Sequence, residues 1–184
     1  MTLHSDVAEL LAGAGIGDVD VDDAVADEHV RSSAYQRVVL VAASSRSRHR
    51  DRAMVAMILR DPSELGSKTA VVALLDMIAA KATGPAEFRQ WSAGLLPEIG
   101  RLRTEEYREF LHRRIQDWVF HLSVKDGHVP APAELANVTD WMQRVVAEES
   151  TSPDVLDLLA GSGSSKKIRN IAKNRAGTRK PRAK

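Results

Sequence analysis

The chain has 184 residues, with 26 Lys and Arg against 25 Asp and Glu, and it contains no Cys. Without Cys there is no disulfide, no thiolate metal site and no cysteine nucleophile, which suits a reducing compartment, so we expect a cytoplasmic location. The N-terminal residues lack the positively charged start of a secretory signal. The longest mainly apolar run, residues 38–43, is far below the roughly 20 residues of a membrane-spanning helix, so we expect no membrane span.

Charge is sorted along the chain. Residues 1–30 carry eight acidic side chains and no Lys or Arg, whereas residues 161–184 carry nine basic side chains and no acid. The formal net charge of +1 therefore hides an acidic N-terminal segment and a basic C-terminal arm. This arrangement indicates a compact body whose arm binds a polyanion, but it does not name the partner.

Apolar residues recur at spacings of three and four through residues 1–160, which predicts a single all-α domain of seven or eight helices. The run Val38–Val41 taken alone is also typical of a buried strand, but its helical neighbours favour a helix. Proline and glycine mark several of the boundaries. The expected helices cover about 5–13, 22–44, 47–60, 67–82, 85–97, 104–125 and 133–149, with a short one starting at 153.

Small and apolar residues surround one aspartate at regular positions in residues 59–78. The pattern consists of Leu59, Asp61, Leu65, Ala70, Ala73 and Leu74. It resembles the core of a HEAT repeat, in which an Asp at the inter-helix turn is followed nine, twelve and thirteen residues later by Ala, Ala and Leu. Pro62 follows the Asp at once, whereas the family places proline three residues after it, and Lys68 stands displaced from the expected Arg. The resemblance implies a HEAT-like stack that serves as a protein-binding scaffold, and the alternative fold is an irregular bundle.

The C-terminal arm, residues 161–184, is predicted to be a flexible linker over 161–165 followed by a disordered basic tail. Only Ile168 and Ile171 are large and apolar, each worth at most about 2–3 kcal/mol when buried, whereas ordering the backbone costs on the order of 1–2 kcal/mol per residue. Together with Ala172 they share one helical face, so the first half of the tail can become a basic helix on a polyanion. The residues expected to contact nucleic-acid phosphates, without sequence preference, are Lys166, Lys167, Arg169, Lys173, Arg175, Arg179, Lys180, Arg182 and Lys184.

A second basic cluster lies at the expected start of the helix over 47–60. It contains Arg46, Arg48, Arg50 and Arg52, with His49 among them. Cations at the start of a helix oppose the helix dipole. The cluster is therefore either a secondary anion patch that acts with the tail or a solvated corner of the fold.

No motif for catalysis, metal binding or a cofactor is found. The acidic run over 18–28 has Asp23 and His29 where a calcium loop needs Gly and Glu, and Gly66–Thr69 lacks the upstream glycine and strand of a phosphate-binding loop. The six His include no pair at a spacing of three or four. We therefore expect no enzyme and no cofactor, although a helical fold can hold a site assembled from distant positions.

Trp91, Trp118 and Trp141 fall on predicted buried faces, so we expect core anchors, with an exposed groove as the alternative. The sequence as a whole predicts a non-catalytic helical binding module whose basic tail binds nucleic acid without sequence preference. The alternative is an adaptor or structural protein whose tail docks on acidic segments of itself or of a partner, and a protein partner for the body and a homo-oligomer are both allowed. Two further interpretations of the basic tail are that it binds an anionic membrane or that it only keeps the protein soluble.

Overall fold

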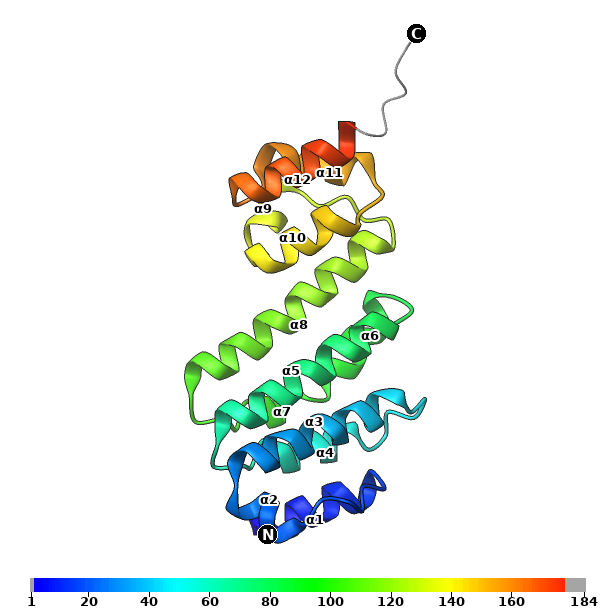
Figure 1. The fold of residues 1–184 in the computed structure, drawn as a ribbon. Helices are drawn as coiled ribbons and strands as arrows, with labels where there is room; N and C mark the ends of the chain where they lie inside the picture. The colour runs from blue at the N-terminus through cyan, green and yellow to red at the C-terminus, as the bar shows by residue number, and fades with distance from the viewer. Residues whose placement is uncertain (1, 178–184) are drawn as a thin grey trace. The chain divides into compact units, whose positions relative to one another are not determined.

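The computed structural model describes residues 2–177, and all regular secondary structure in this range is helical (Figure 1). The all-α prediction is confirmed. The described range holds twelve α-helices instead of seven or eight, because three expected segments are each divided in two and the C-terminal region adds another helix. Among these helices, none is both long enough and apolar enough to cross a membrane.

One of these divisions separates α2 (Val21–Ala26) from α3 (Glu28–Ser44). Asp27 stands between the two helices in an extended conformation, and its carboxylate accepts a hydrogen bond from the amide of His29 at 2.7 Å. An aspartate in this position satisfies an amide that has no partner within the helix. A single polar side chain thus ends one helix and starts the next.

The helices of the described residues pack into two compact units. Among the described residues, unit 1 comprises 2–82 together with 87–115, and unit 2 comprises 83–86 together with 116–177. Helix α8 (Glu105–Lys125) contributes residues to both.

Unit 1 contains α2, α3 and the first part of α8. Its other helices are α1 (Leu3–Gly13), α4 (Asp51–Ile58), α5 (Glu64–Lys81), α6 (Pro85–Ala93) from residue 87 onward, and α7 (Leu96–Ile99). Helices α3 and α5 pack side by side (Figure 1). Val39 on α3 and Val71 and Leu74 on α5 are fully buried. The apolar α5 therefore lies in the core of unit 1, as its wide arc of apolar residues predicts.

A buried ion pair fixes the turn between α4 and α5. Asp61, which carries the resemblance to a HEAT repeat, accepts hydrogen bonds from Arg31 Nε at 2.6 Å, from the Tyr35 hydroxyl at 2.8 Å and from the amide of Ser63 at 2.7 Å. Arg31 also donates to the carbonyl of Ala24 at 2.9 Å, near the end of α2. Burial and the bond to Asp61 raise the pKa of Tyr35 above its usual range, so the phenol keeps its proton and donates. The pair joins α2, α3 and this turn.

A second carboxylate of low exposure anchors the segment that precedes α8. Glu64 accepts hydrogen bonds from the amides of Arg103 at 2.6 Å and Thr104 at 2.9 Å. Burial acts to raise the pKa of Glu64, but the hydrogen bonds from Thr104 and Arg103 outweigh it and hold that pKa at about 2. Glu64 is therefore ionised near neutral pH and holds the chain at the start of α8.

Unit 2 combines the rest of α8 with four short helices. They are α9 (Pro132–Ala136), α10 (Asp140–Glu149), α11 (Pro153–Ser162) and α12 (Lys166–Gly177). Helices α11 and α12 lie side by side, and α12 also packs on α10 (Figure 1). The buried core of the unit is formed by Val124, Leu135, Met142, Val146, Ala147, Val155, Leu156, Leu159, Ile168 and Ala172.

The C-terminal region differs from its prediction. Residues 166–177, predicted to be a disordered tail, form α12, and 161–165, predicted to be a linker, contain the end of α11 and a turn. The prediction is wrong for these residues because the tail does not stand alone: Ile168 and Ala172 of α12 pack into a core with apolar side chains of α10 and α11. The rest of the predicted tail, 178–184, lies outside the described residues.

The tryptophans are less buried than predicted. Trp91 and Trp118 are half-buried, and Trp141 is 39% exposed. The rings of Trp118 and Trp141 meet edge to face with their centroids 5.7 Å apart. The prediction of a core anchor is therefore wrong for Trp141, which leaves much of its ring in solvent.

Candidate nucleic-acid interface

Helix α12 follows α11 through a tight turn at Gly163. A Cβ atom at this position would lie 2.6 Å from the carbonyl oxygen of Leu159 and 2.9 Å from Cγ2 of Ile168, so only glycine fits without moving a helix. The Ser165 hydroxyl accepts a hydrogen bond from the amide of Ile168 at 3.3 Å and caps α12. Glycine and serine, which are typical of flexible linkers, here form an ordered connection between two helices.

One face of α12 is held in the core of unit 2. Ile168 and Ala172, one turn apart, are buried, and Ile171 and Ala176 pack against the same core while half-buried. These spacings of three and four place all four side chains on one side of the helix. An isolated helix of this length is marginal in water, so packing against α10 and α11 orders α12.

A buried glutamine links the surrounding elements. Gln143 on α10 donates its side-chain amide hydrogens to the carbonyls of Leu135 at 3.0 Å and Val138 at 3.1 Å. Its carbonyl oxygen accepts a hydrogen bond from the amide of Ser164 at 2.9 Å. Both kinds of group on the side chain are therefore satisfied. Gln143 thus joins α9 and α10 to the turn before α12.

The opposite face of α12 carries exposed lysines. Lys166, Lys167 and Lys173 form this lysine face, and Asn170 and Asn174 are exposed beside them. Within residues 2–177 none of the three lysines has an ion-pair partner. Lys166 and Lys167 lie in the first turn, where the helix dipole is already positive, at a cost of a few tenths of a kcal/mol each. Their placement does not serve the stability of α12, and their charges face water.

The two arginines of α12 have a different role from the lysines. Arg169 donates to the carbonyl of Gly163 at 2.6 Å, and Arg175 donates to the carbonyl of Ser150 at 3.1 Å. Both side chains are half-buried, so they help to hold α12 on its unit. The structure thus places five of the nine predicted binding residues on α12. Three of them, the lysines, face solvent, and the two arginines hold the helix on its unit. The other four, Arg179, Lys180, Arg182 and Lys184, lie outside the described residues.

Three arginines of the second basic cluster, Arg46, Arg48 and Arg50, lie between α3 and α4, and Arg52 lies in the first turn of α4, which begins at Asp51. Arg48 donates to the carbonyl oxygens of Ala42, at 2.7 Å, and of Ser45, and its guanidinium is 3.2 Å from the carboxylate of Asp51. The last carbonyls of a helix have no partner within it and carry partial negative charge, so a cation is favourable there. This position of Arg48 has a structural reason that needs no external anion.

Of the other arginines of the cluster, one forms an ion pair within the protein and two face solvent. Arg52 Nε lies 3.0 Å from the carboxylate of Glu98, which is buried on α7. Arg46 and Arg50 are exposed, and neither has an ion-pair partner in the part of the chain that the structure describes. Two of the four arginines therefore hold the fold together, and two face solvent.

Residues 2–177 contain no candidate metal site, because no three His, Asp or Glu side chains among them lie close enough together to hold an ion. No family model, curated protein or solved structure gives a significant match to the chain. Any statement about function therefore rests on the residues of this chain.

Proposed function

We propose that this protein is a non-catalytic helical module of the cytoplasm that binds nucleic acid without sequence preference, through the lysine face of α12 and the basic residues that follow it. The observation that carries the proposal is that Lys166, Lys167 and Lys173 are exposed on one side of a helix whose other side is packed in a core. The nine basic and no acidic residues of 161–184 add a positive field around this face.

The geometry of the lysine face suits backbone phosphates. From Lys166 to Lys173 a helix rises about 10 Å, which is close to three base-pair steps of about 3.4 Å each. Asn170, exposed between them, can donate a hydrogen bond to a phosphate or sugar oxygen. No aromatic residue occurs in α12, so this helix cannot stack on bases as single-strand binding proteins do. We therefore expect a duplex to bind at least as tightly as a single strand.

The test replaces the lysine face by neutral side chains of similar length, with Lys166→Gln, Lys167→Gln and Lys173→Gln in one full-length variant. Each phosphate contact adds about 0.9 to the slope of log affinity against log salt concentration for a duplex. Losing three contacts should make this slope shallower by about 2.7 and weaken binding at low salt. Fluorescence anisotropy with a labelled duplex at several salt concentrations measures both effects.

A matched control removes three exposed cations elsewhere, with Arg89→Gln, Arg113→Gln and Lys125→Gln, and so changes the net charge by the same amount. This control should keep most of the salt slope. An equal loss in both variants would mean that only net charge matters and would rule out a defined face. Unchanged binding in the lysine variant would rule out nucleic-acid binding through α12.

A second candidate is an adaptor whose basic face docks on an acidic partner or on another copy of the chain. Asp22 and Asp23, exposed in the first turn of α2, favour it because they lie in the acidic segment 1–30 and oppose the lysine face in charge. Light scattering over a salt series without nucleic acid should then show a salt-dependent particle size, and a constant size would exclude this candidate. The HEAT-like arrangement of the body, which implies a protein-binding scaffold, stays a prediction.

A further inference from the structure

A cleft of about 790 Å³ lies between α1, α3 and α4 of unit 1. This volume falls in the range of small-molecule sites, about 300–1,000 Å³. Most of its walls are apolar. The larger apolar side chains of the lining are Leu10, Val38, Val41, Met54 and Met57.

Small residues keep this cleft open. Ala12, Gly13 and Ala14 line it at the end of α1, and Ala53 lines it on α4. A Cβ atom added at Gly13 would meet no atom within 4 Å, so there is free space at this point. Val41 is 46% exposed, although its side chain is apolar and water is an unfavourable neighbour for it. An apolar ligand would cover Val41 and fill space that the side chains leave empty.

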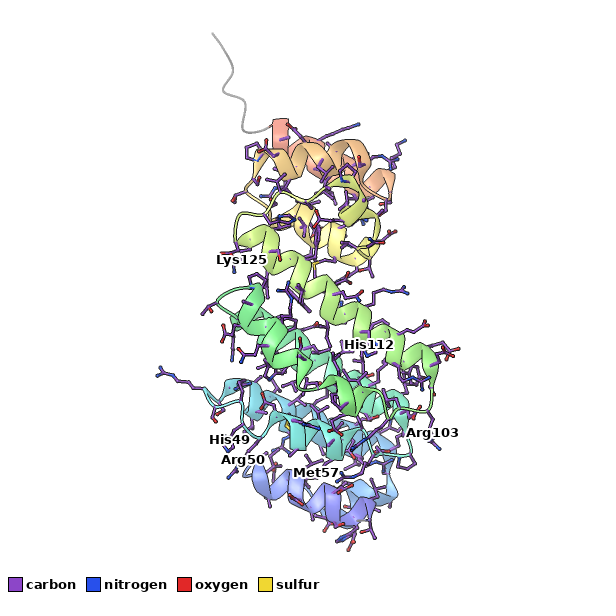
Figure 2. All side chains as sticks on the ribbon, turned by 180° about the vertical axis from the view of Figure 1, so that it is seen from behind. His49, Arg50, Met57, Arg103, His112 and Lys125 are labelled. Carbon is purple, nitrogen blue, oxygen red and sulfur yellow. The ribbon has the colours of Figure 1, made fainter. Side chains whose placement is uncertain are left out.

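Positive charge stands at one end of the cleft. Arg50 and His49 line it at the connection before α4, and Met57 lines it farther along that helix (Figure 2). Arg50 is exposed and has no ion-pair partner among residues 2–177. A cation beside an apolar cleft is complementary to a ligand with an apolar chain and an anionic end.

Neither acid of the lining, Asp51 or Glu9, forms an ion pair with Arg50 within residues 2–177. Asp51 accepts a hydrogen bond from Trp91 Nε1 at 2.9 Å, and its carboxylate lies 3.2 Å from Arg48. Glu9 lies on α1 and is exposed, and nearby Arg60 pairs with Asp6 at 2.6 Å. Arg50 therefore keeps an exposed guanidinium without an ion pair, among the described residues, at this end of the cleft.

We infer that the cleft binds a free single-chain carboxylate, with the carboxylate at Arg50 and the acyl chain running along α4 toward Met57. Between these two residues the helix rises about 10 Å. An extended chain covers about 1.2 Å per bond, so a chain of eight to ten carbons matches the distance. This site lies in unit 1 and does not depend on the proposed role of α12.

Calorimetric titration of the full-length protein with hexanoate, octanoate and decanoate tests the inference. Burial of each added CH₂ should tighten binding about fourfold until the chain fills the cleft. Decyltrimethylammonium, with the same chain length and a positive end, should bind at least about fivefold more weakly than decanoate. Equal affinity for the two decyl compounds would overturn the assignment of the anionic end, and no saturable binding at any chain length would overturn the site.

Two variants locate the site. Ala53→Phe should fill the cleft and abolish decanoate binding, whereas Ala93→Phe, at an exposed alanine of α6 outside the lining, should leave it unchanged. Arg50→Gln should weaken decanoate about fivefold and leave decanol unaffected. Wild-type binding by Ala53→Phe would refute the location. If the wild type proved dimeric, failed to bind decanoate and became monomeric on Ala53→Phe, the occupant would be a second copy and the inference would be wrong.

Discussion

Replacing Ile168 by Ala should weaken the packing of α12 on unit 2, so that α12 opens locally more often while the rest of the unit stays folded. Ile168 is 2% exposed and is the only large side chain of α12 that is fully buried in the core. Truncating a buried Ile to Ala costs about 2–5 kcal/mol. We expect about 3 kcal/mol here, since Ala172 alone remains as a buried contact. Such a loss is large beside the total stability of about 5–15 kcal/mol of a folded domain.

Native-state hydrogen exchange of the α12 amides measures this loss locally. A loss of about 3 kcal/mol makes exchange through local opening roughly 100-fold faster. Ile171→Ala is the matched control, because Ile171 is half-buried and its truncation should cost only about 1 kcal/mol. Equal exchange rates in the two variants, or an unchanged rate in Ile168→Ala, would refute the packing argument for α12.

Two further predictions concern the buried carboxylates of unit 1. Asp61→Ala should cost about 3–5 kcal/mol in urea unfolding because Arg31 is left buried without its carboxylate, and a cost below about 1 kcal/mol would contradict the buried pair. Glu64 has its pKa lowered from 4.5 to about 2 in the folded state, so its stabilisation is complete above about pH 5 and is lost as pH falls toward 2, by up to about 3 kcal/mol. Glu64→Gln should flatten the stability curve between these pH values, and identical curves for the variant and the wild type would count against the assignment.

Local patterns in the sequence are sufficient to predict the positions of most helices of unit 1. The apolar arc of α5 and the Asp61–Pro62 corner locate a central helix and the turn before it. The division between α2 and α3 is harder to predict, because the apolar pattern continues across Asp27 and an aspartate suits both a cap and an exposed helical position. The division of the chain into two units leaves no local signal, since it depends on which helices contact each other.

The sequence predicts which basic residues belong to the candidate site, but not that five of them lie on an ordered helix. Nine basic residues indicate a polyanionic partner. Which of them are exposed, as Lys173 is, and which are half-buried, as Arg175 is, depends on which side of α12 packs on the core. The ordering of α12 depends on side chains of α10 and α11, which lie outside the segment itself. The spacing of Ile168, Ile171 and Ala172 indicates that this segment can form a helix with one apolar face. Whether that helix is ordered in the free protein depends on the core that α10 and α11 provide.

The buried amide of Gln143 makes α12 a preorganised element. If α12 swung away, the side-chain oxygen of Gln143 would lose the amide of Ser164, and leaving such a group unpaired costs about 1–3 kcal/mol. The spacing of the lysine Cα atoms is therefore set before any ligand arrives, and binding need not restrict this backbone further, although the exposed lysine side chains stay flexible. A stiff polyanion whose charges recur about every 10 Å can meet the lysines at both ends of the face at once, whereas a flexible one loses conformational entropy when it adopts that spacing.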